Sequence, residues 1–535
     1  MLTKTQQAVT LPQTRLPMAC TLDACALATQ ASGESLLLEK TVELPSPLSG
    51  EGELFTSTLS PQMRLLDFVG KASLWALLLT TVFYGCTPES KDAEKRREAD
   101  KTEQEQSTTA SSPEGFAPIS ALGEEQIAVD AAPLANLEQI LSELKASAYH
   151  NQGIRAESLK IAVLDNGFQG HADSIGKRLP PDTQLMQLSG NPLAPTSHGL
   201  KLAEIAYAIA TGQNTYDPSI PGPQILLVNT NGYSNFVEAV DTVIAENVDI
   251  VLYAQVWEYG GNFDGSGFIN REVNRALASG ILWLNAAGNM GKGTWHGGVE
   301  LDPWLNVKLP HRRDKSDPGS LRLQVRAPNS YVKIVLSWND FRDDKDYHTP
   351  QDLDLYLLNS SNIPVASATK IQSGSAPKTP DQRYSAHARE IIKVALPVGS
   401  YSVRIKAKSK NFDKTSRLRI TVDSASVDLI DRIEEQTVLI PADNMGVVTI
   451  GAIDVDYTGR KYHGKPELLV NSKVVFEDGL THYGSSAATA IAAGAMALYS
   501  ERFGVPSKAE VDRQILSGNL IDTTTAQRKL VLPTP

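Results

Sequence analysis

The residues best suited to chemistry stand at the start of a run of small side chains. Gly484, Ser485 and Ser486 precede a segment that is built almost entirely of alanine and other small apolar residues. A helix with no polar face is buried on all sides. Its N-terminus offers free N–H groups and the positive end of the helix dipole, so a serine there could be a nucleophile whose oxyanion meets backbone donors. The alternative is that both serines only cap a core helix.

Three further polar residues stand where apolar runs end or helical patterns begin. Asp165 ends one apolar run, His198 opens a helical pattern, and Asn289 follows a second apolar run. Because the carboxyl ends of parallel strands meet at one rim of a sheet, these side chains can converge with Ser486. Taken singly, Asp165 could be a turn cap, His198 a surface residue and Asn289 a turn former. In the order Asp, His, Asn, Ser they indicate acyl transfer by a serine nucleophile.

These motifs resemble those of the subtilisin-like serine peptidases, or subtilases. The stretch 484–494 (GSSAATAIAAG) resembles their serine box, 286–289 (AAGN) resembles their oxyanion-asparagine box, and His198-Gly199 resembles their histidine box. Each motif is weak by itself, whereas four in the expected order are specific. The resemblance covers about residues 158–300 and 430–520.

The resemblance implies a role for each matched residue. Ser486 would be the nucleophile, His198 its general base, and Asp165 the carboxylate that fixes the imidazole tautomer. The Asn289 amide and the Ser486 backbone N–H would stabilise the oxyanion. A strand that pairs with the substrate backbone and the oxyanion box supply the expected substrate-binding residues, which are Ala254, Gln255, Val256, Ala287 and Gly288.

The chain also departs from the family pattern. The departures are Leu200 in place of Thr, Ala490 and Ile491 in place of Pro and His, and residues 254–256 (AQV) in place of Ser-Leu-Gly. Backbone pairing with a substrate survives such side-chain changes, so peptide cleavage is still expected, but the family's specificity is not carried over. Trp257 and Tyr259 either line the cleft or belong to the core.

Apolar runs and amphipathic segments alternate through the first part of the folded region. The runs predict strands at 160–165, 224–229, 249–256 and 280–285, and the segments predict helices at 200–211, 235–247 and 268–279. Strand and helix patterns return at 446–455, in the serine helix and at 508–516. This alternation predicts an α/β fold with a doubly wound, mostly parallel sheet of the subtilisin type.

The pattern changes near residue 302. Strand-like segments separated by turn residues follow at 320–327, 332–339, 353–358, 390–396, 401–408 and 417–423. They predict an all-β sandwich inserted into the α/β domain. The predicted parts are 132–301 and 429–525 for the subtilase domain, 302–428 for the sandwich and 526–535 for a C-terminal tail. We expect deletion of the sandwich to change substrate choice more than triad geometry.

Acidic residues in the sandwich raise the question of calcium. Six aspartates could supply oxygen ligands, namely Asp340, Asp343, Asp344, Asp346, Asp352 and Asp354. The alternative is a solvated acidic loop. We therefore assign no metal ligands and expect no required cofactor, with Ca²⁺ as an optional structural ion.

Composition excludes several classes of protein. With a net charge of −11 and no long basic stretch, the chain is not expected to bind nucleic acid. All three cysteines, Cys20, Cys25 and Cys86, precede the folded region. This distribution excludes a cysteine protease and predicts neither disulfides nor thiolate metal sites in the folded part.

The N-terminal region predicts a lipid anchor. Residues 63–86 combine two basic residues with an apolar run that ends at Cys86, which resembles a bacterial lipoprotein signal with Cys86 as the lipidated residue. Residues 1–62 are then a disordered or mis-annotated extension, and the polar stretch 87–131 is a disordered linker. The alternative is a buried apolar hairpin in a cytoplasmic protein. We expect a protein of the cell envelope, extracytoplasmic, and either lipid-anchored or secreted.

Together these features predict a serine endopeptidase that acts on proteins or peptides. An inactive subtilase-like surface lipoprotein that binds proteins is the alternative, and an esterase or other acyl hydrolase is a third interpretation. One amphipathic helix expected at 134–148 is too short for the inhibitory prodomain that subtilases often have. The sequence leaves the oligomeric state open.

Overall fold

A computed structural model describes residues 133–310, 319–372, 385–459 and 464–535. The predicted extension 1–62, the signal segment 63–86 with Cys86, and the linker 87–131 lie outside these residues. Within the described part, no helix combines the length and the apolar character needed to cross a membrane.

A seven-stranded sheet forms the centre of the larger part of the fold. Its strand order is β16-β15-β5-β4-β1-β3-β2, and every pair is parallel. The strands are β1 (Lys160–Asp165), β2 (Gln184–Met186), β3 (Gln224–Asn229), β4 (Ile250–Tyr253), β5 (Leu282–Ala286), β15 (Val448–Ala452) and β16 (Leu468–Val470). The prediction of an α/β fold is confirmed. However, the predicted strand 249–256 ends at Tyr253, so residues 254–256 follow the strand.

Helices cover both faces of this sheet. The eight helices that can be labelled in the described residues are α3 (Leu137–Leu144), α4 (Ser147–His150), α5 (His171–Ser174), α6 (His198–Thr211), α7 (Tyr233–Ala245), α8 (Phe268–Ala278), α9 (Ser485–Phe503) and α10 (Lys508–Leu516). Ile161 and Val163 of β1 pack into the core with α6 and α9, whereas Ala162 and Leu164 pack into the core with α7 and α8. The alternation of β1 side chains therefore separates two cores.

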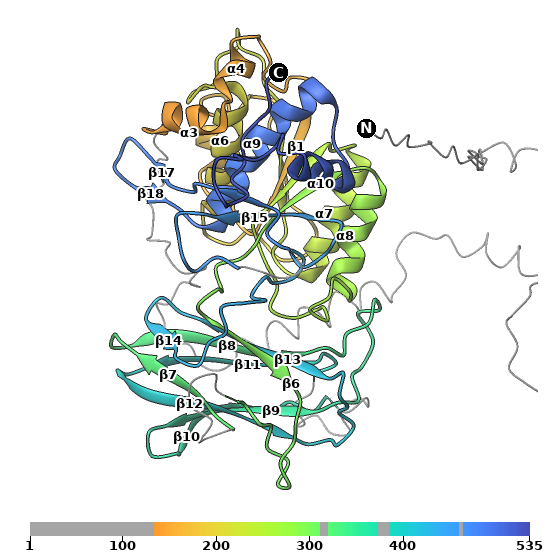
Figure 1. Ribbon diagram of the computed structural model, residues 1–535, viewed down its shortest axis with the longest axis vertical. Helices are drawn as coiled ribbons and strands as arrows, with labels where there is room; N and C mark the ends of the chain where they lie inside the picture. The colour runs from red at the N-terminus through yellow and green to blue at the C-terminus, as the bar shows by residue number, and fades with distance from the viewer. Residues whose placement is uncertain (1–132, 311–318, 373–384, 460–463) are drawn as a thin grey trace, which may run out of the picture. The chain divides into compact units, whose positions relative to one another are not determined.

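The serine helix α9 is buried on all sides, as its composition predicts. Its residues from Ser485 to Ser500 are buried, and it packs beside α6 (Figure 1). The closest approach is at Gly494, where a Cβ would lie 2.5 Å from the Ala206 carbonyl oxygen. Only glycine fits there, because any side chain would push the two helices apart.

The inserted part is a sandwich of two antiparallel sheets, below the parallel sheet in Figure 1. The five-stranded sheet has the order β10-β9-β12-β7-β14 and the four-stranded sheet the order β11-β8-β13-β6. Their strands are β6 (Thr294–Gly298), β7 (Leu321–Val325), β8 (Ser330–Trp338), β9 (Leu353–Asn359), β10 (Pro364–Ala368), β11 (Arg389–Leu396), β12 (Gly399–Ala407), β13 (Arg417–Asp423) and β14 (Val427–Leu429). The predicted class, an α/β fold with an inserted β module, is confirmed.

The chain enters and leaves the sandwich at other residues than the sequence indicates. Strand β6 pairs with β13, so the sandwich begins before the predicted boundary at 302, and β14 straddles the predicted end at 428. The short β6 sequence TWHGG lacks the alternation that marks a strand. The predicted tail 526–535 also packs on the α/β part, since Leu530 is fully buried and its N–H donates to the Leu469 carbonyl.

The prediction of a single helix at 134–148 is wrong, because the chain forms the two helices α3 and α4 there. Lys145 adopts a left-handed conformation with a φ of 60°, which ends α3. Beyond these helices, the short strands β17 (Val474–Val475) and β18 (Thr481–His482) form a hairpin directly before α9. That hairpin leads directly into α9.

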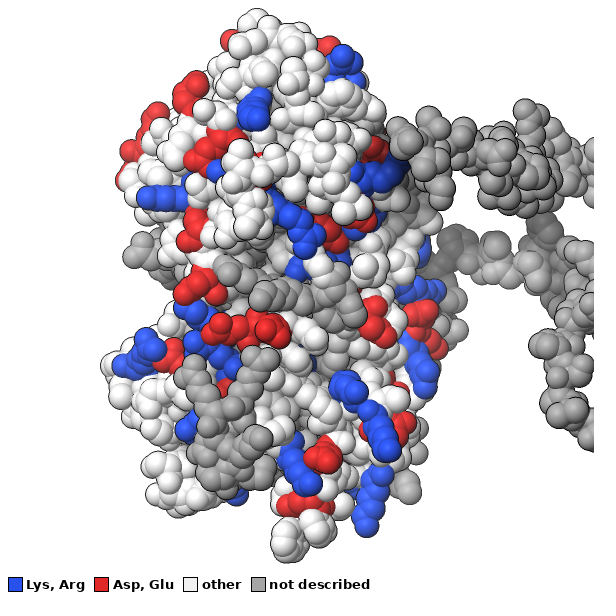
Figure 2. All heavy atoms as spheres, viewed as in Figure 1, with Lys and Arg blue, Asp and Glu red and all other residues white. Residues whose placement is uncertain are grey.

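Charges of both signs are mixed on the visible surface. Figure 2 shows acidic and basic side chains interspersed over both the α/β part and the sandwich on this face. No broad field of a single sign forms among the described residues on that face.

Candidate active site

Asp165, the last residue of β1, pairs with His198, the first residue of α6. His198 Nδ1 lies 2.7 Å from Asp165 Oδ2, and Asp165 is only 1% exposed. The other carboxylate oxygen accepts hydrogen bonds from the backbone N–H groups of Asn166 (2.8 Å) and Gly167 (3.3 Å). Because a carboxylate only accepts, the imidazole proton sits on Nδ1 and leaves Nε2 as the basic nitrogen. Gly199 permits this contact, since a Cβ there would meet the Asp165 Cβ at 2.5 Å.

Ser486 is the second residue of α9 and follows a sharp turn. Gly484 holds that turn with a φ of 103°, and its N–H donates to Ser472 Oγ at 3.0 Å. Ser472 in turn donates to Asp454 Oδ1 at 2.7 Å. The Ser486 hydroxyl makes a long hydrogen bond of 3.4 Å to the Ala254 carbonyl at the end of β4. The Ser486 hydroxyl therefore makes only a long hydrogen bond, whereas the backbone turn before α9 is anchored through Ser472 and Asp454.

Asn289 joins the oxyanion box to the serine helix. Its Oδ1 accepts the Ser485 backbone N–H at 3.1 Å and the Ser485 hydroxyl at 3.0 Å. These bonds orient the amide and leave Nδ2 as its donor group, beside Gly484. Neither serine makes a side-chain cap of α9, whose N-cap is Gly484. The capping alternative for Ser485 and Ser486 is therefore wrong.

The four predicted residues gather at one rim of the sheet. Strands β5, β4 and β1 are neighbours, and their carboxyl ends lead to Asn289, Ala254 and Asp165. Both helices that carry the other two residues begin at the same rim, with His198 as the first residue of α6. This arrangement supplies a base, a hydroxyl and an amide donor, which is the set that acyl transfer requires.

The predicted substrate-binding residues form two segments that face each other closely. A Cβ on Gly288 would meet the Val256 Cγ2 at 3.2 Å, so the valine side chain packs against that glycine. Ala287 is fully buried, and Gly288 O accepts the Gly459 N–H at 2.8 Å. Gln255 is half-buried, and its carbonyl accepts a hydrogen bond from Asn285 at 3.2 Å. The space between the segments is therefore narrow.

Trp257 and Tyr259 belong to packed regions. The Trp257 indole N–H donates to the Tyr253 hydroxyl at 2.8 Å, and its ring packs against Phe236. Burial raises the pKa of Tyr253 well above its usual range, so this phenol stays protonated. Tyr259 lies beneath the guanidinium of Arg389 from the sandwich. Of the two alternatives for these aromatics, packing is the one that the contacts support.

Sequence reasoning missed a second histidine at the site. His482 is the last residue of β18, is 6% exposed, and its ring centroid lies 5.7 Å from that of His198 in an edge contact. The supporting pair Ser472 and Asp454 was missed as well. His482 stands only four residues before Ser486, which is the one sequence signal that could have suggested it.

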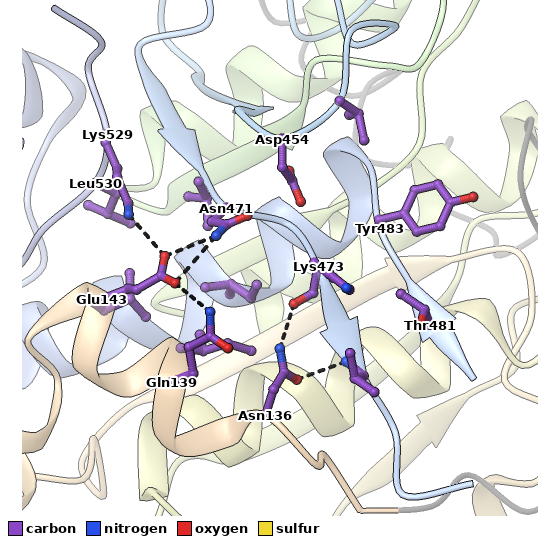
Figure 3. Close-up of a pocket in the computed structure, with 16 residues that line it drawn as sticks. Asn136, Gln139, Glu143, Asp454, Asn471, Lys473, Thr481, Tyr483, Lys529 and Leu530 are labelled. Carbon is purple, nitrogen blue, oxygen red and sulfur yellow. Dashed lines mark hydrogen bonds and ion pairs between the residues drawn. The ribbon is translucent and has the colours of Figure 1, made fainter. Parts of the chain in front are cut away.

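A separate cavity of about 630 Å³ lies on the subtilase part (Figure 3). Glu143 of α3 accepts hydrogen bonds there from Asn471 and Gln139 and forms an ion pair with Lys529. The residues that line the cavity are Asn136, Gln139, Ile140, Glu143, Leu144, Asp454, Val455, Val470, Asn471, Lys473, Val475, Thr481, Tyr483, Ile491, Lys529 and Leu530. They include Tyr483, just before the serine turn, but none of the predicted triad.

Two of the aspartates suggested for calcium have protein partners. Asp340 accepts the Thr349 hydroxyl at 2.6 Å, and Asp354 pairs with Lys408 at 3.1 Å. Burial raises the pKa of Asp352 to about 6, as does the nearby Asp354. Among the described residues, no group of three histidine, cysteine or acidic side chains could hold a metal ion. Calcium binding stays a prediction.

Comparison with known proteins identifies a family. The family model described as the Subtilase family matches residues 156–530. Subtilisin amylosacchariticus of Bacillus subtilis subsp. amylosacchariticus is 27% identical over 161 residues, which cover 28% of this chain and 39% of that protein. Subtilisin of Bacillus pumilus has the same identity over 161 residues, which cover 54% of it. The chain thus spans about half or less of the length of these relatives.

The chain is similar to the CspB protease of Clostridium perfringens, with a TM-score of 0.46 and 13% identity. The match covers 74% of this chain and 97% of that one. The match to the family model spans the inserted sandwich as well as both parts of the α/β domain.

Proposed function

The chain belongs to the subtilase family of serine peptidases, and we propose that it hydrolyses peptide bonds through Asp165, His198 and Ser486. In this proposal it is an endopeptidase whose substrates are extracytoplasmic proteins or peptides. The observation that carries the proposal is the 2.7 Å contact between His198 Nδ1 and the buried Asp165 carboxylate. Such a contact fixes the tautomer that makes Nε2 a base.

The chemical steps follow from these groups. His198 Nε2 takes the proton of the Ser486 hydroxyl as its oxygen attacks the substrate carbonyl, and the Asp165 carboxylate stabilises the resulting imidazolium. The imidazolium then returns the proton to the leaving amine, which produces an acyl-enzyme. Water attacks the acyl group with the same base, and the free serine is restored.

The oxyanion of each tetrahedral intermediate needs donors that are already in place. Asn289 supports this role, because its Oδ1 is held by the Ser485 N–H and hydroxyl, which directs Nδ2 away from them. The Ser486 backbone N–H at the start of α9 is the second donor in the proposal, and the helix dipole adds to its effect.

The location of the protein is part of the proposal. Lipid attachment at Cys86 would place the chain in the cell envelope, although Cys86 lies outside the described residues. Metabolic labelling with a fatty-acid analogue tests this attachment. We expect label on the wild type and none on Cys86→Ser, whereas label on both would contradict the anchor at Cys86.

The inactive binding protein remains the second candidate, because one observation favours it. The Val256 side chain packs against Gly288. The backbone N–H of Trp257 already donates to the Ile440 carbonyl at 2.6 Å. Both contacts narrow the space in which a substrate would lie. Neither contact disturbs the pair of His198 and Asp165, so the peptidase is preferred.

Hydrolysis of a mixed peptide library separates the two candidates. We expect the wild type to cleave a subset of peptides and Ser486→Ala to cleave none. Asp165→Asn keeps the shape of the pair but favours the wrong imidazole tautomer, so it should lose about four orders of magnitude in kcat. Peptide cleavage that persists in Ser486→Ala would overturn the assignment.

A further inference from the structure

The segment that follows the predicted substrate-binding residues is held by the inserted sandwich. Residues 257–263 lie within the connection between β4 and α8, directly after Ala254, Gln255 and Val256. Apart from an isolated bridge at Trp257, the segment has no strand or helix of its own. Its partners come largely from the outer face of the four-stranded sheet.

Strand β8 supplies the first two contacts, and both are made with Glu258. The Ser337 hydroxyl donates to the Glu258 carbonyl at 2.9 Å, and Lys333 Nζ lies 2.6 Å from its carboxylate. Both β8 residues lie on the face opposite to Ile334 and Leu336, which pack in the sandwich core. Ser337 and Glu258 are both buried, so the hydrogen bond is shielded from water.

Two arginines flank Ser337 in register. Arg389 of β11 and Arg419 of β13 are each directly opposite Ser337 in the four-stranded sheet. The Arg389 guanidinium lies 3.8 Å from the Tyr259 ring centroid, and that of Arg419 lies 4.5 Å from the Phe263 ring centroid. This row of Arg389, Ser337 and Arg419, here called the cross-strand row, therefore contacts both ends of the segment.

A fifth contact closes the far end of the segment. The Asn262 amide donates to the Phe341 carbonyl at 2.9 Å and accepts the Phe341 N–H at 2.9 Å. This paired bond imitates a strand pairing between the segment and the chain after β8. Five contacts thus fix seven residues that have no regular structure.

From this convergence we infer that the cross-strand row is a positioning surface, which holds residues 254–256 in place for the substrate backbone. The inference rests on the proposed peptidase function and gives the inserted sandwich a role in it. A backbone segment that pairs with a peptide must keep its place to within a fraction of an ångström. The sandwich supplies this rigidity from outside the α/β domain.

The first test measures the rigidity and does not depend on activity. Hydrogen–deuterium exchange at residues 254–263 is compared for the full chain and for Arg389→Ala and Tyr259→Ala. We expect exchange about tenfold faster in both variants, the size of one shielded cation–π contact. Tyr259→Phe keeps the ring and should match the wild type. Arg404→Ala, on the other sheet, is the matched control and should also be silent.

The second test separates positioning from chemistry. In the same variants, KM for a peptide of several residues should rise about tenfold, while the rate of labelling by a small fluorophosphonate stays within about twofold. Ser337→Ala removes one hydrogen bond and replaces Arg389→Ala if that variant fails to fold.

The outcomes are distinguishable. Unchanged exchange in both Arg389→Ala and Tyr259→Ala overturns the inference, whatever the activity. The inference is also overturned if the rates of peptide hydrolysis and of labelling decrease by the same factor in folded variants. The cross-strand row would then support the triad rather than residues 254–256. A wild type that neither cleaves nor labels refutes the peptidase function, and the exchange result still decides the role of the row.

Discussion

The contact between α6 and α9 gives a prediction that links packing to catalysis. His198 begins α6 and Ser486 stands at the start of α9, and the helices touch at Ala206 and Gly494, each eight residues further along. Eight helical residues span about 12 Å, so this contact lies about two turns from both catalytic candidates. Gly494→Ala inserts one methyl group at the point that sets the helix separation.

Two opposing effects decide how much Gly494→Ala changes the free energy of unfolding. Alanine favours a helix over glycine by about 1 kcal/mol, which stabilises the variant. Its Cβ would lie 2.5 Å from the Ala206 oxygen, however, and ordinary contacts begin at 3.4 Å, so the helices must separate by roughly 0.9 Å. Overpacking of this kind costs about 1–3 kcal/mol, which exceeds the propensity gain in most of its range. A shift near 1 Å between nucleophile and base costs about a hundredfold in rate.

We therefore expect Gly494→Ala to lose up to about 2 kcal/mol of unfolding free energy and about a hundredfold in kcat/KM. Urea unfolding measures the first quantity and steady-state peptide hydrolysis the second. Gly298→Ala is the control, because its Cβ would find only ordinary contacts at 3.7 Å and beyond. A variant of Gly494 that is more stable than the wild type and fully active would refute the reasoning.

Two further predictions concern single side chains. Burial raises the pKa of Glu390 to about 8 from 4.5, so the folded state keeps a proton that the unfolded chain releases. The free energy of unfolding should then fall by roughly 3–5 kcal/mol as the pH rises through that window, and Glu390→Gln should abolish the fall in urea titrations at pH 5 and pH 8. An equal decrease in the free energy of unfolding for the wild type and Glu390→Gln would contradict this role of Glu390. Asn289→Ala should lower kcat about 100- to 1000-fold through loss of the oxyanion donor. Asn289→Asp keeps the acceptor for Ser485 and should preserve stability better than Asn289→Ala, whereas equal losses of stability would contradict the role of that oxygen.

Much of the sheet and the rim could be predicted because local pattern and position coincide there. A continuous apolar run such as 160–165 must be a buried strand, and its last residue must then stand at the rim. The order of Asp165, His198, Asn289 and Ser486 along the chain therefore led to residues that the fold brings to one rim. In these places the local sequence alone predicts the position of a residue in the fold, without knowledge of the residues that contact it from distant segments.

The remaining features depend on contacts between distant segments. The cross-strand row exists only through the register of β8, β11 and β13, which no local pattern encodes. The edge contact of His482 with His198 arises because the hairpin of β17 and β18 folds back onto the rim. The break at Lys145 depends on a backbone conformation that lysine rarely adopts, so a helical pattern across it was misleading.

The central claim is that Ser486 is an activated nucleophile, and covalent labelling tests it most directly. The native protein is treated with a fluorophosphonate, digested, and the modified peptide is identified by mass spectrometry. We expect one adduct on Ser486, which is lost in Ser486→Ala and retained in Ser485→Ala. An absence of any adduct on the folded protein, or an adduct on Ser485 instead, would contradict it.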